Sequence, residues 1–434
     1  MTREHQTRLS LSRVLFSGLK IGRALLLGLW LGTIPAISQA ADETAPDIRS
    51  AAALYYTGAQ SKEAAPLPVP WAPWELYENF KQQRLNPSGR VISTLGREGR
   101  DGSSSAEAQA YGMFFALINN DQELFARLWQ FVKGTLTEDS VERLPAALYG
   151  YPKKGTENKP VSGTGPSQGQ APGQSSGQSS GSGPRILDRH GDAHAALFLA
   201  YDLLEAARLW QDNEYAQSAH QIMTLIKSQC TLRDPVLGTL LTPDCQHDSR
   251  VLRPAAYPLF VLERLSREDT DFKDIAHDTV HSLLKAAGSG FWPEYARYNA
   301  EGDFLLGPAT CFYTDSLRAY LWVSLTNQAD PNYRLVKDAL KRSVFFISLQ
   351  RDPINKVFLY DDTRVGFGGP AHASAYLHFL PPGLGRDYLR LSAFEHRYGD
   401  EEYLGQILAL FAQGFDERRF ALAPDGTLQV YFTK

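Results

Sequence analysis

The stretch AYDLLEAARLW at residues 200–210 indicates how this chain folds. Its apolar residues recur three and four positions apart, which places them on one face of an α-helix. The stretch EYLGQILALFAQGF at residues 402–415 has the same spacing. The same reasoning predicts helices over residues 74–85, 107–118, 122–132, 141–148, 193–210, 214–230, 254–265, 272–287, 314–325, 333–349, 386–396 and 401–411. Because strand patterns are few, the sequence predicts an all-α protein.

The clearest strand signal lies near the C-terminus. The segments RRFALA and TLQVYF flank Pro424-Asp425-Gly426, which predicts a small C-terminal β-hairpin. Helices joined by long loops rich in Gly and Pro suit a closed barrel of helical hairpins. A helical solenoid is the structural alternative, but no repeat of fixed period supports it.

The first 40 residues differ from the rest of the chain. Five basic residues precede an apolar run over residues 24–34, and Ser38-Gln39-Ala40 offers small residues for cleavage. This pattern predicts a cleavable signal peptide over residues 1–40 and a periplasmic or secreted protein; an uncleaved anchor is the alternative. Residues 41–70 are then an N-terminal extension, and residues 71–434 form a single domain.

The charge balance excludes one class of partner. Residues 1–40 carry five of the 44 basic residues and one of the 48 acidic residues, so the mature chain has 39 and 47, a net charge of −8. An acidic chain rich in aromatic residues is a poor nucleic-acid binder and suits a neutral ligand such as a polysaccharide. After signal cleavage no membrane partner is expected.

The cysteines and one low-complexity segment complete the bulk description. A Cys230–Cys245 disulfide is plausible in an oxidising compartment, although spacing alone leaves it open, and Cys311 lies in an apolar stretch. No Cys/His cluster has zinc spacing, so we expect no metal. Residues 153–184, rich in Gly, Ser, Gln and Pro, predict a disordered insert within one domain, with an interdomain linker as the alternative.

Two carboxylates stand at the mouths of apolar helices. Glu107, in SAEAQAYGM at residues 105–113, directly follows a Gly/Ser loop. A half-buried carboxyl group at such a junction can stay protonated near neutral pH and donate a proton, whereas a first-turn acid favoured by the helix dipole is the alternative. Asp315, in CFYTDSLRAYLWVSL at residues 311–325, could equally cap its helix or pair with Arg318.

Ordered motifs around these acids resemble glycoside hydrolase family 8, and within it the periplasmic endoglucanases that accompany bacterial cellulose synthases. The matching segments run from about residue 71 to about residue 429. They are GRVIS at 89–93, SSAEAQAYGMFFALINND at 104–121, LPAALYG at 144–150, ILD at 186–188, LFLAYDLLEAARLW at 197–210, FWPEYARY at 291–298, YTDSLRAYLWV at 313–323 and LALFAQGFDERRF at 408–420.

The resemblance implies an (α/α)6 barrel with a long groove across its mouth. It also implies inverting hydrolysis of β-1,4-glucan without a cofactor, beside a cellulose synthase and export complex. Glu107 matches the general acid of the family and Asp315 its general base. Inversion requires two such carboxyl groups about 6.5–9.5 Å apart, so that a water molecule fits between the base and the sugar. A weakly catalytic glucan-binding protein and a hydrolase of another polysaccharide are the alternatives.

Several positions depart from the family pattern. In an ungapped match, His194 replaces the aspartate that holds the sugar at the cleavage point, and Asp192 could take over only if the helix start were rewound. Ala108 and Ala110 replace small or hydroxyl residues beside the acid, and the aromatic residue expected before ILD is missing. A purely structural role for His194 is the alternative.

Further residues are candidates for sugar contacts. Tyr111, Trp292 and Tyr313 flank the matched motifs, and flat aromatic faces suit the C–H faces of sugars. Trp322, further into its helix, fits the core better. Arg318 lies one turn after Asp315, where it could orient that carboxylate or bind a sugar hydroxyl; we favour orientation.

Overall fold

The computed structural model describes residues 73–96, 99–152, 183–245, 250–288, 292–305, 317–340, 357–360, 363–366, 394, 396–399 and 402–431. The chain divides into two compact units, Met1–Asp47 and Ile48–Lys434, and every described residue belongs to the second. Within these residues, no helix combines the length and the apolar character that a membrane crossing requires.

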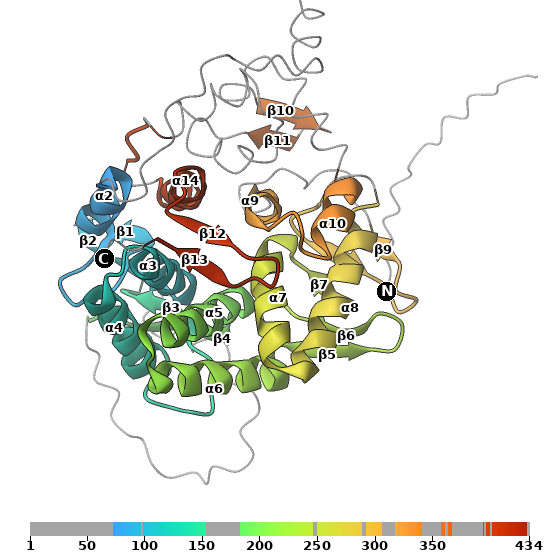
Figure 1. Cartoon of the computed structure of the whole chain (residues 1–434), viewed down its shortest axis with the longest axis horizontal. Coiled ribbons are helices and arrows are strands. Elements are labelled where there is room, and N and C mark those ends of the chain that lie inside the picture. Colours follow the sequence, from blue (N-terminus) through green and yellow to red (C-terminus); the bar gives the residue numbers. More distant parts are fainter. Residues whose placement is uncertain are drawn as a thin grey trace, which may run out of the picture. The chain divides into compact units, whose positions relative to one another are not determined.

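Helices in the described unit alternate between an inner and an outer position (Figure 1). The inner helices are α3 (Ala106–Ile118), α5 (Ala193–Trp210), α7 (Leu259–Glu268), α9 (Leu317–Leu325) and α14 (Tyr403–Asp416). The outer helices are α2 (Glu75–Arg84), α4 (Gln122–Phe131), α6 (Asn213–Gln229), α8 (Thr270–Ala286) and α10 (Tyr333–Ala339). Successive inner helices pack side by side, each covered by an outer neighbour. These five described pairs follow the arrangement of an (α/α)6 barrel and confirm the predicted fold class.

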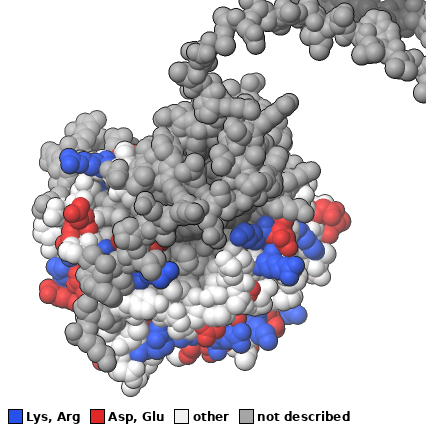
Figure 2. Space-filling view, turned by 45° about the horizontal axis from the view of Figure 1, so that its top comes forward, with Lys and Arg blue, Asp and Glu red and all other residues white. Residues whose placement is uncertain are grey.

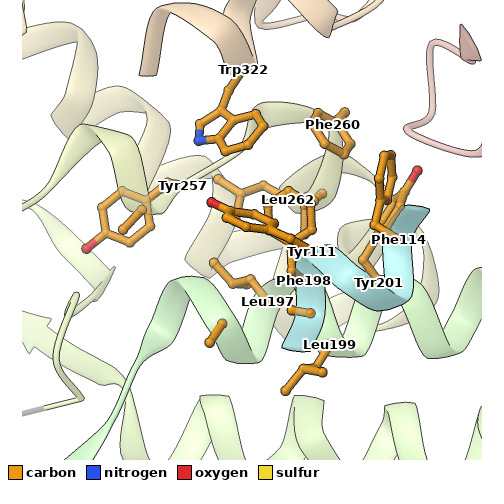
Figure 3. Close-up of a cluster of buried hydrophobic side chains, with 14 of the residues drawn as sticks. Tyr111, Phe114, Leu197, Phe198, Leu199, Tyr201, Tyr257, Phe260, Leu262 and Trp322 are labelled. Carbon is orange, nitrogen blue, oxygen red and sulfur yellow. The ribbon is translucent and has the colours of Figure 1, made fainter. Parts of the chain in front are cut away.

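The barrel core is aromatic. Tyr111 and Phe114 of α3, Phe198 of α5 and Trp322 of α9 pack edge to face or tilted against one another and against Phe411 of α14. Figure 3 shows the rings of Tyr111, Phe114, Phe198 and Trp322 together with that of Phe260 from α7. Such ring pairs add to the free energy gained by burying apolar area, so they fix the inner helices against each other. The expected core position of Trp322 is confirmed, since its side chain is buried.

Acidic and hydroxyl side chains start the helices. Ser105, Asp121, Asp192, Asp212 and Asp269 each accept a hydrogen bond from a backbone N–H in the first turn of the helix that follows. These bonds satisfy donors that have no partner inside the helix. The caps therefore set where α3 and α5 begin, which decides the placement of the residues discussed below.

Short antiparallel strands occupy the loops. The first sheet has the order β1 (Thr94–Gly96), β2 (Gly99–Ser105), β3 (Ala146–Gly150), β4 (Arg185–Gly191). Further strands are β5 (Thr231–Asp234) with β6 (Gly238–Leu241), β7 (Val251–Leu252) with β8 (Ala296–Tyr298) and β9 (Phe304–Leu305), and β10 (Val357–Tyr360) with β11 (Thr363–Gly366). The helix predicted over residues 141–148 is wrong. Pro145 lacks the N–H that a helix needs, and β3 takes its partners from β2 and β4 instead.

The C-terminal hairpin is confirmed. Strand β12 (Phe420–Leu422) pairs with β13 (Leu428–Val430) in antiparallel register. Gly426 has a φ of +78° in the turn, and a Cβ there would lie 2.1 Å from the Phe260 carbonyl oxygen. The Gly426 carbonyl accepts a hydrogen bond from Tyr201, and the Leu428 N–H donates to the buried Glu205. The hairpin therefore packs against the second half of α5 and against the first turn of α7.

A disulfide joins Cys230 to Cys245, as the sequence suggested. Cys245 packs against the junction of β4 and α5, because a Cβ on Gly191 would lie 3.2 Å from its sulfur. The Ala193 N–H also donates to the Pro243 carbonyl in the same loop. The disulfide thus supports the segment from which Asp192 projects. Cys311 lies outside the described residues.

Candidate active site

Glu107 is the only residue of α3 that is partly exposed. Every other residue of α3 is buried, whereas the Glu107 side chain is 16% exposed. Strand β2 leads directly into α3, and the Ser105 hydroxyl caps the helix by accepting from the Ala108 N–H at 3.0 Å. The carboxylate therefore stands in the first turn of an inner helix, where β2 enters it.

Arg318 holds one oxygen of that carboxylate. Its Nη1 donates to Oε2 of Glu107 and to the Tyr111 hydroxyl, the latter at 3.0 Å. The guanidinium is buried. Oε1 of Glu107 has no hydrogen-bond partner among the described residues. The ion pair fixes one oxygen, so the other can face a substrate. Among the described residues Arg318 holds Glu107, and the predicted contact with Asp315 involves a residue that lies outside them.

His194 extends the hydrogen-bond network of Arg318, Glu107 and Tyr111 into the core. Its Nε2 lies 2.6 Å from the Tyr111 hydroxyl and 3.9 Å from Oε2 of Glu107, and its Nδ1 lies 3.0 Å from the Ala256 carbonyl oxygen. A carbonyl can only accept, so Nδ1 carries the hydrogen and Nε2 accepts from Tyr111. Burial and the Arg318 charge lower the pKa of His194 well below its usual value. The ring is neutral, and both of its nitrogens are engaged.

Asp192 is the carboxylate that the first turn of α5 presents to a pocket. Helix α5 begins at Ala193, and Asp192 caps it by accepting from the Ala195 N–H at 3.1 Å. Burial raises the pKa of Asp192, and the nearby Glu107 carboxylate raises it further, whereas Arg253 opposes the shift. Asp192 therefore shares its electrostatic environment with Glu107, while the His194 side chain, 1% exposed, is turned into the core.

The pocket beside Asp192 has a volume of about 480 Å³. Its walls combine charged side chains with one exposed aromatic residue, Tyr295. Arg253 and Tyr295 are not among the candidates that the sequence predicts. The polar and aromatic lining residues are Asp188, His190, Asp192, Asp244, Arg253, Tyr295 and Arg297. A neutral polyhydroxylated ligand finds both hydrogen-bonding groups and a ring face there. Tyr295 lies in the matched segment FWPEYARY at residues 291–298, whereas Arg253 lies outside the matched segments.

Two aromatic candidates do not present a ring to solvent. Trp292 is 2% exposed, and its indole N–H donates to the Leu283 carbonyl at 2.9 Å. Tyr111 is also buried, and its hydroxyl connects Arg318 with His194. Both rings belong to the packing of the barrel rather than to a groove surface. Tyr295, three residues after Trp292, is the exposed aromatic residue of that segment.

Tyr403 is a further residue of this site that the sequence did not single out. It begins α14, and its hydroxyl is buried without a hydrogen-bond partner among the described residues. Burial raises the pKa of Tyr403 well above its usual value, and the Glu107 carboxylate adds to this shift. The phenol is therefore a protonated donor close to Glu107. The only sequence signal was its place at the start of an apolar helix.

Two of the sequence-based candidates lie outside the described residues. These are Asp315, the expected general base, and Tyr313, an expected sugar contact. Within the described part of the chain, no three His, Cys, Asp or Glu side chains converge as metal ligands would. The chemistry that the described site offers is that of carboxyl groups held by hydrogen bonds.

Comparisons with known proteins agree with this architecture. The family model described as "Glycosyl hydrolases family 8" matches residues 51–167 and 179–418. An endoglucanase from Salmonella typhi is 26% identical over 362 residues, which cover 82% of this chain and 90% of the relative. An endoglucanase from Xanthomonas axonopodis pv. citri is 28% identical over 383 residues, covering 83% and 90%.

A solved structure shows the same fold. The crystal structure of an endo-1,4-D-glucanase from Vibrio fischeri aligns with a TM-score of 0.66 at 24% identity. The alignment covers 82% of this chain and 99% of that protein.

Proposed function

The chain belongs to glycosyl hydrolase family 8, and we propose that it is an endo-β-1,4-glucanase that cleaves its substrate with inversion at the anomeric carbon. Its relatives from Salmonella typhi and Xanthomonas axonopodis carry the name endoglucanase. On the face shown in Figure 2, Lys and Arg side chains are interspersed with Asp and Glu among the described residues. Such a mixed surface suits a neutral glucan.

The observation that carries the proposal is the placement of Glu107. It is the one residue of α3 that is not buried, and Arg318 fixes its Oε2. Glu107 acts in its protonated form, with the proton on Oε1 while Oε2 accepts from Arg318, and Oε1 gives that proton to the glycosidic oxygen. The leaving sugar departs as an alcohol, and positive charge develops on the ring that remains. A fixed carboxyl geometry matters here, because proton transfer needs heavy atoms within about 2.6–3.2 Å.

Asp315 completes the proposed reaction as the general base. It takes a proton from a water molecule, whose oxygen attacks the anomeric carbon from the side opposite the leaving group. Arg318, three positions after Asp315 in the sequence, contacts Glu107, which supports a shared site for the two acids. Asp192 and the Tyr403 hydroxyl are proposed to bind sugar hydroxyls beside the acid, because both lie within its electrostatic reach.

A second candidate function is supported by His194. The family aspartate at this position is replaced by a neutral histidine whose nitrogens are both engaged within the protein. A chain that binds glucan and cleaves it weakly is consistent with that replacement. Asp192 supports the first candidate function, hydrolysis. It lines the neighbouring pocket and places a carboxyl group at the start of α5, where the family aspartate is missing.

The cellular setting is also a proposal. The basic and apolar pattern of residues 1–40 supports export to the periplasm, where the enzyme would trim glucan beside a cellulose synthase and export complex. Expression of the full chain in a Gram-negative host, followed by mass measurement of the periplasmic protein, tests the export. Loss of residues 1–40 is expected, and retention of the whole segment would contradict a cleaved signal.

The test of activity compares glucans. The chain without residues 1–40 should release reducing ends from carboxymethylcellulose, with a rapid fall in viscosity, and much less from β-1,3-glucan or xylan. Glu107→Gln should reduce the rate about 10²–10⁴-fold with an unchanged melting temperature. Glu123→Gln, an exposed first-turn acid of α4, is the matched control. Equal activity in Glu107→Gln would show that another residue is the acid, and retention on insoluble cellulose without hydrolysis would favour the second candidate.

A further inference from the structure

A second pocket lies outside the site just described. It has a volume of about 730 Å³, within the range of about 300–1,000 Å³ that is common for small-ligand sites. Its walls come from the loop after α2, the end of α4 with the π-helical turn η1 (Val132–Leu136), strand β3, and Pro184 before β4. The two pockets share no lining residue. Figure 1 shows α4 and β3, which contribute residues to the walls of this second pocket.

Aromatic side chains form one part of the wall. Phe131 and Tyr149 meet edge to face, with ring centroids 5.5 Å apart, and the Arg90 guanidinium lies 5.5 Å from the centre of the Tyr149 ring. These contacts hold Tyr149 in place. Tyr151, two residues further along the chain, is 39% exposed. Its ring is accessible to a ligand.

Neutral polar groups and a second arginine form the rest. Asn86 and Gln130 contribute amides, Ser88 and Thr135 contribute hydroxyls, and Arg127 is exposed without an ion-pair partner among the described residues. No Asp, Glu or Lys lines the pocket. Ring faces next to amides and hydroxyls match a ligand that has apolar C–H faces and a rim of hydroxyl groups, which is a sugar chain.

The pocket wall is also connected to β2, the strand that precedes Glu107. The buried Arg90 donates to the Ser104 hydroxyl and to the Gly102 carbonyl of β2. Strand β2 continues into the first turn of α3, which carries Glu107. A polymer held at this pocket would therefore stay next to the active site, although it touches none of the residues assigned to the reaction.

We propose that this pocket is a second glucan-binding site, which holds a segment of a β-1,4-glucan chain outside the catalytic centre. The identity of the polymer rests on the proposed function, whereas the existence of the site rests on the pocket alone. Tyr151 is the ring on which a sugar stacks, and Gln130 and Arg127 are the donors to its hydroxyls. The site keeps the polymer attached between cleavage events, so its effect is confined to long substrates.

The experiment measures binding separately from cleavage. In the inactive Glu107→Gln background, Tyr151→Ala with Gln130→Ala should weaken adsorption to amorphous cellulose about fivefold, because one stacked ring and one amide donor are lost. Tyr431→Ala, which removes a ring that is 52% exposed elsewhere, is the control and should leave adsorption unchanged. In the active protein, the same pair of changes should slow hydrolysis of amorphous cellulose and leave hydrolysis of cellotetraose unchanged.

The outcomes separate the two proposals. Adsorption that equals the Tyr431→Ala control would overturn the second site even if the enzyme cleaves cellulose. A fivefold loss in a protein that hydrolyses no glucan would support the site and contradict the proposed activity. Tighter adsorption to polygalacturonate than to cellulose would assign the pocket to an anionic polymer and would also overturn the proposal. Melting temperatures equal to that of the parent show that each variant is folded.

Discussion

The Tyr111 hydroxyl oxygen lies 2.6 Å from Nε2 of His194, and this contact joins α3 to α5 directly below Glu107. The direction of the network is fixed at both ends. Arg318 can only donate and the Ala256 carbonyl can only accept, so the Tyr111 hydroxyl accepts from Arg318 and donates to a neutral His194. The site of Glu107 is thus built on a histidine that stays uncharged.

Replacing His194 with Asn should make the stability of the protein fall less steeply as the pH is lowered. Because the pKa of His194 is lowered in the folded protein, the unfolded chain binds a proton that the folded one does not. The stability from this group is complete above the unfolded pKa of about 6.5 and is lost as the pH falls toward the folded pKa. Melting temperatures measured between about pH 5 and pH 8 should therefore slope less in His194→Asn than in the parent.

The control for this measurement is His281→Asn, which changes an exposed histidine of α8. That variant should keep the slope of the parent. A parent protein whose melting temperature is flat below pH 6.5 would contradict a neutral, buried His194. His194→Asn should also melt at a lower temperature overall, because the Tyr111 hydroxyl loses its acceptor, at a cost of about 1–3 kcal/mol.

Replacing Asp192 with Asn should lower kcat on carboxymethylcellulose at least tenfold. Asn caps a helix as well as Asp does, so α5 keeps its start while the pocket loses a carboxyl group. In its ionised form that group favours the positive charge that develops on the sugar ring in the transition state. Asp212→Asn makes the same change at the cap of α6, away from the pocket, and should leave kcat unchanged.

The variant His194→Asp decides between the two positions at the start of α5. The ungapped family match predicts that this change restores a sugar-holding carboxylate and raises turnover. The structure leads to the opposite expectation, because the new carboxylate would be buried next to Glu107 without the donors that a carboxylate needs. A rise in kcat in His194→Asp, with an indifferent Asp192→Asn, would show that position 194 contacts the substrate.

Asp202 should destabilise the protein as the pH rises. It is fully buried in α5, and neither carboxyl oxygen has a hydrogen-bond partner among the described residues. Burial raises the pKa of Asp202 well above its usual value, and the Glu205 carboxylate adds to the shift. The folded protein therefore binds a proton that the unfolded chain releases, so stability falls as the pH rises from about 4 toward the raised pKa.

Asp202→Asn removes this proton linkage. The variant should melt at a higher temperature than the parent at neutral pH, with a difference that shrinks toward about pH 4. Differential scanning calorimetry at several pH values measures it. Asp274→Asn, an exposed change in α8, should follow the parent at every pH. A difference that is independent of pH would mean that Asp202 is ionised in the folded protein.

The insert should be removable. Strands β3 and β4 pair with Gly150 opposite Arg185, so the chain ends on either side of residues 153–182 already lie next to each other. A link of a few Gly and Ser residues can join them, and a shorter loop lowers the entropy cost of closure by about 1 kcal/mol. The deletion should leave the melting temperature unchanged or slightly raised. A large fall would show that these residues pack on the barrel.

Much of the fold could be predicted because it depends on near neighbours in the chain. Apolar residues three and four positions apart predict the inner helices. Pro424-Asp425-Gly426 predicts the hairpin, in which Gly426 has a positive φ. The error at residues 141–148 has the same origin. An apolar spacing can be read as a helix there, but Pro145 and pairing with β2 and β4 make β3 instead.

The sequence by itself determined the helical barrel and the position of Glu107 at the first turn of an inner helix, because helix periodicity and capping act within about four residues. The tertiary structure decided which groups meet. Glu107 and Arg318 are 211 positions apart, and Tyr111 and His194 are 83 apart. Contacts over such separations depend on how whole helices pack. That packing turned His194 and Trp292 into the core and left Asp192 at a pocket.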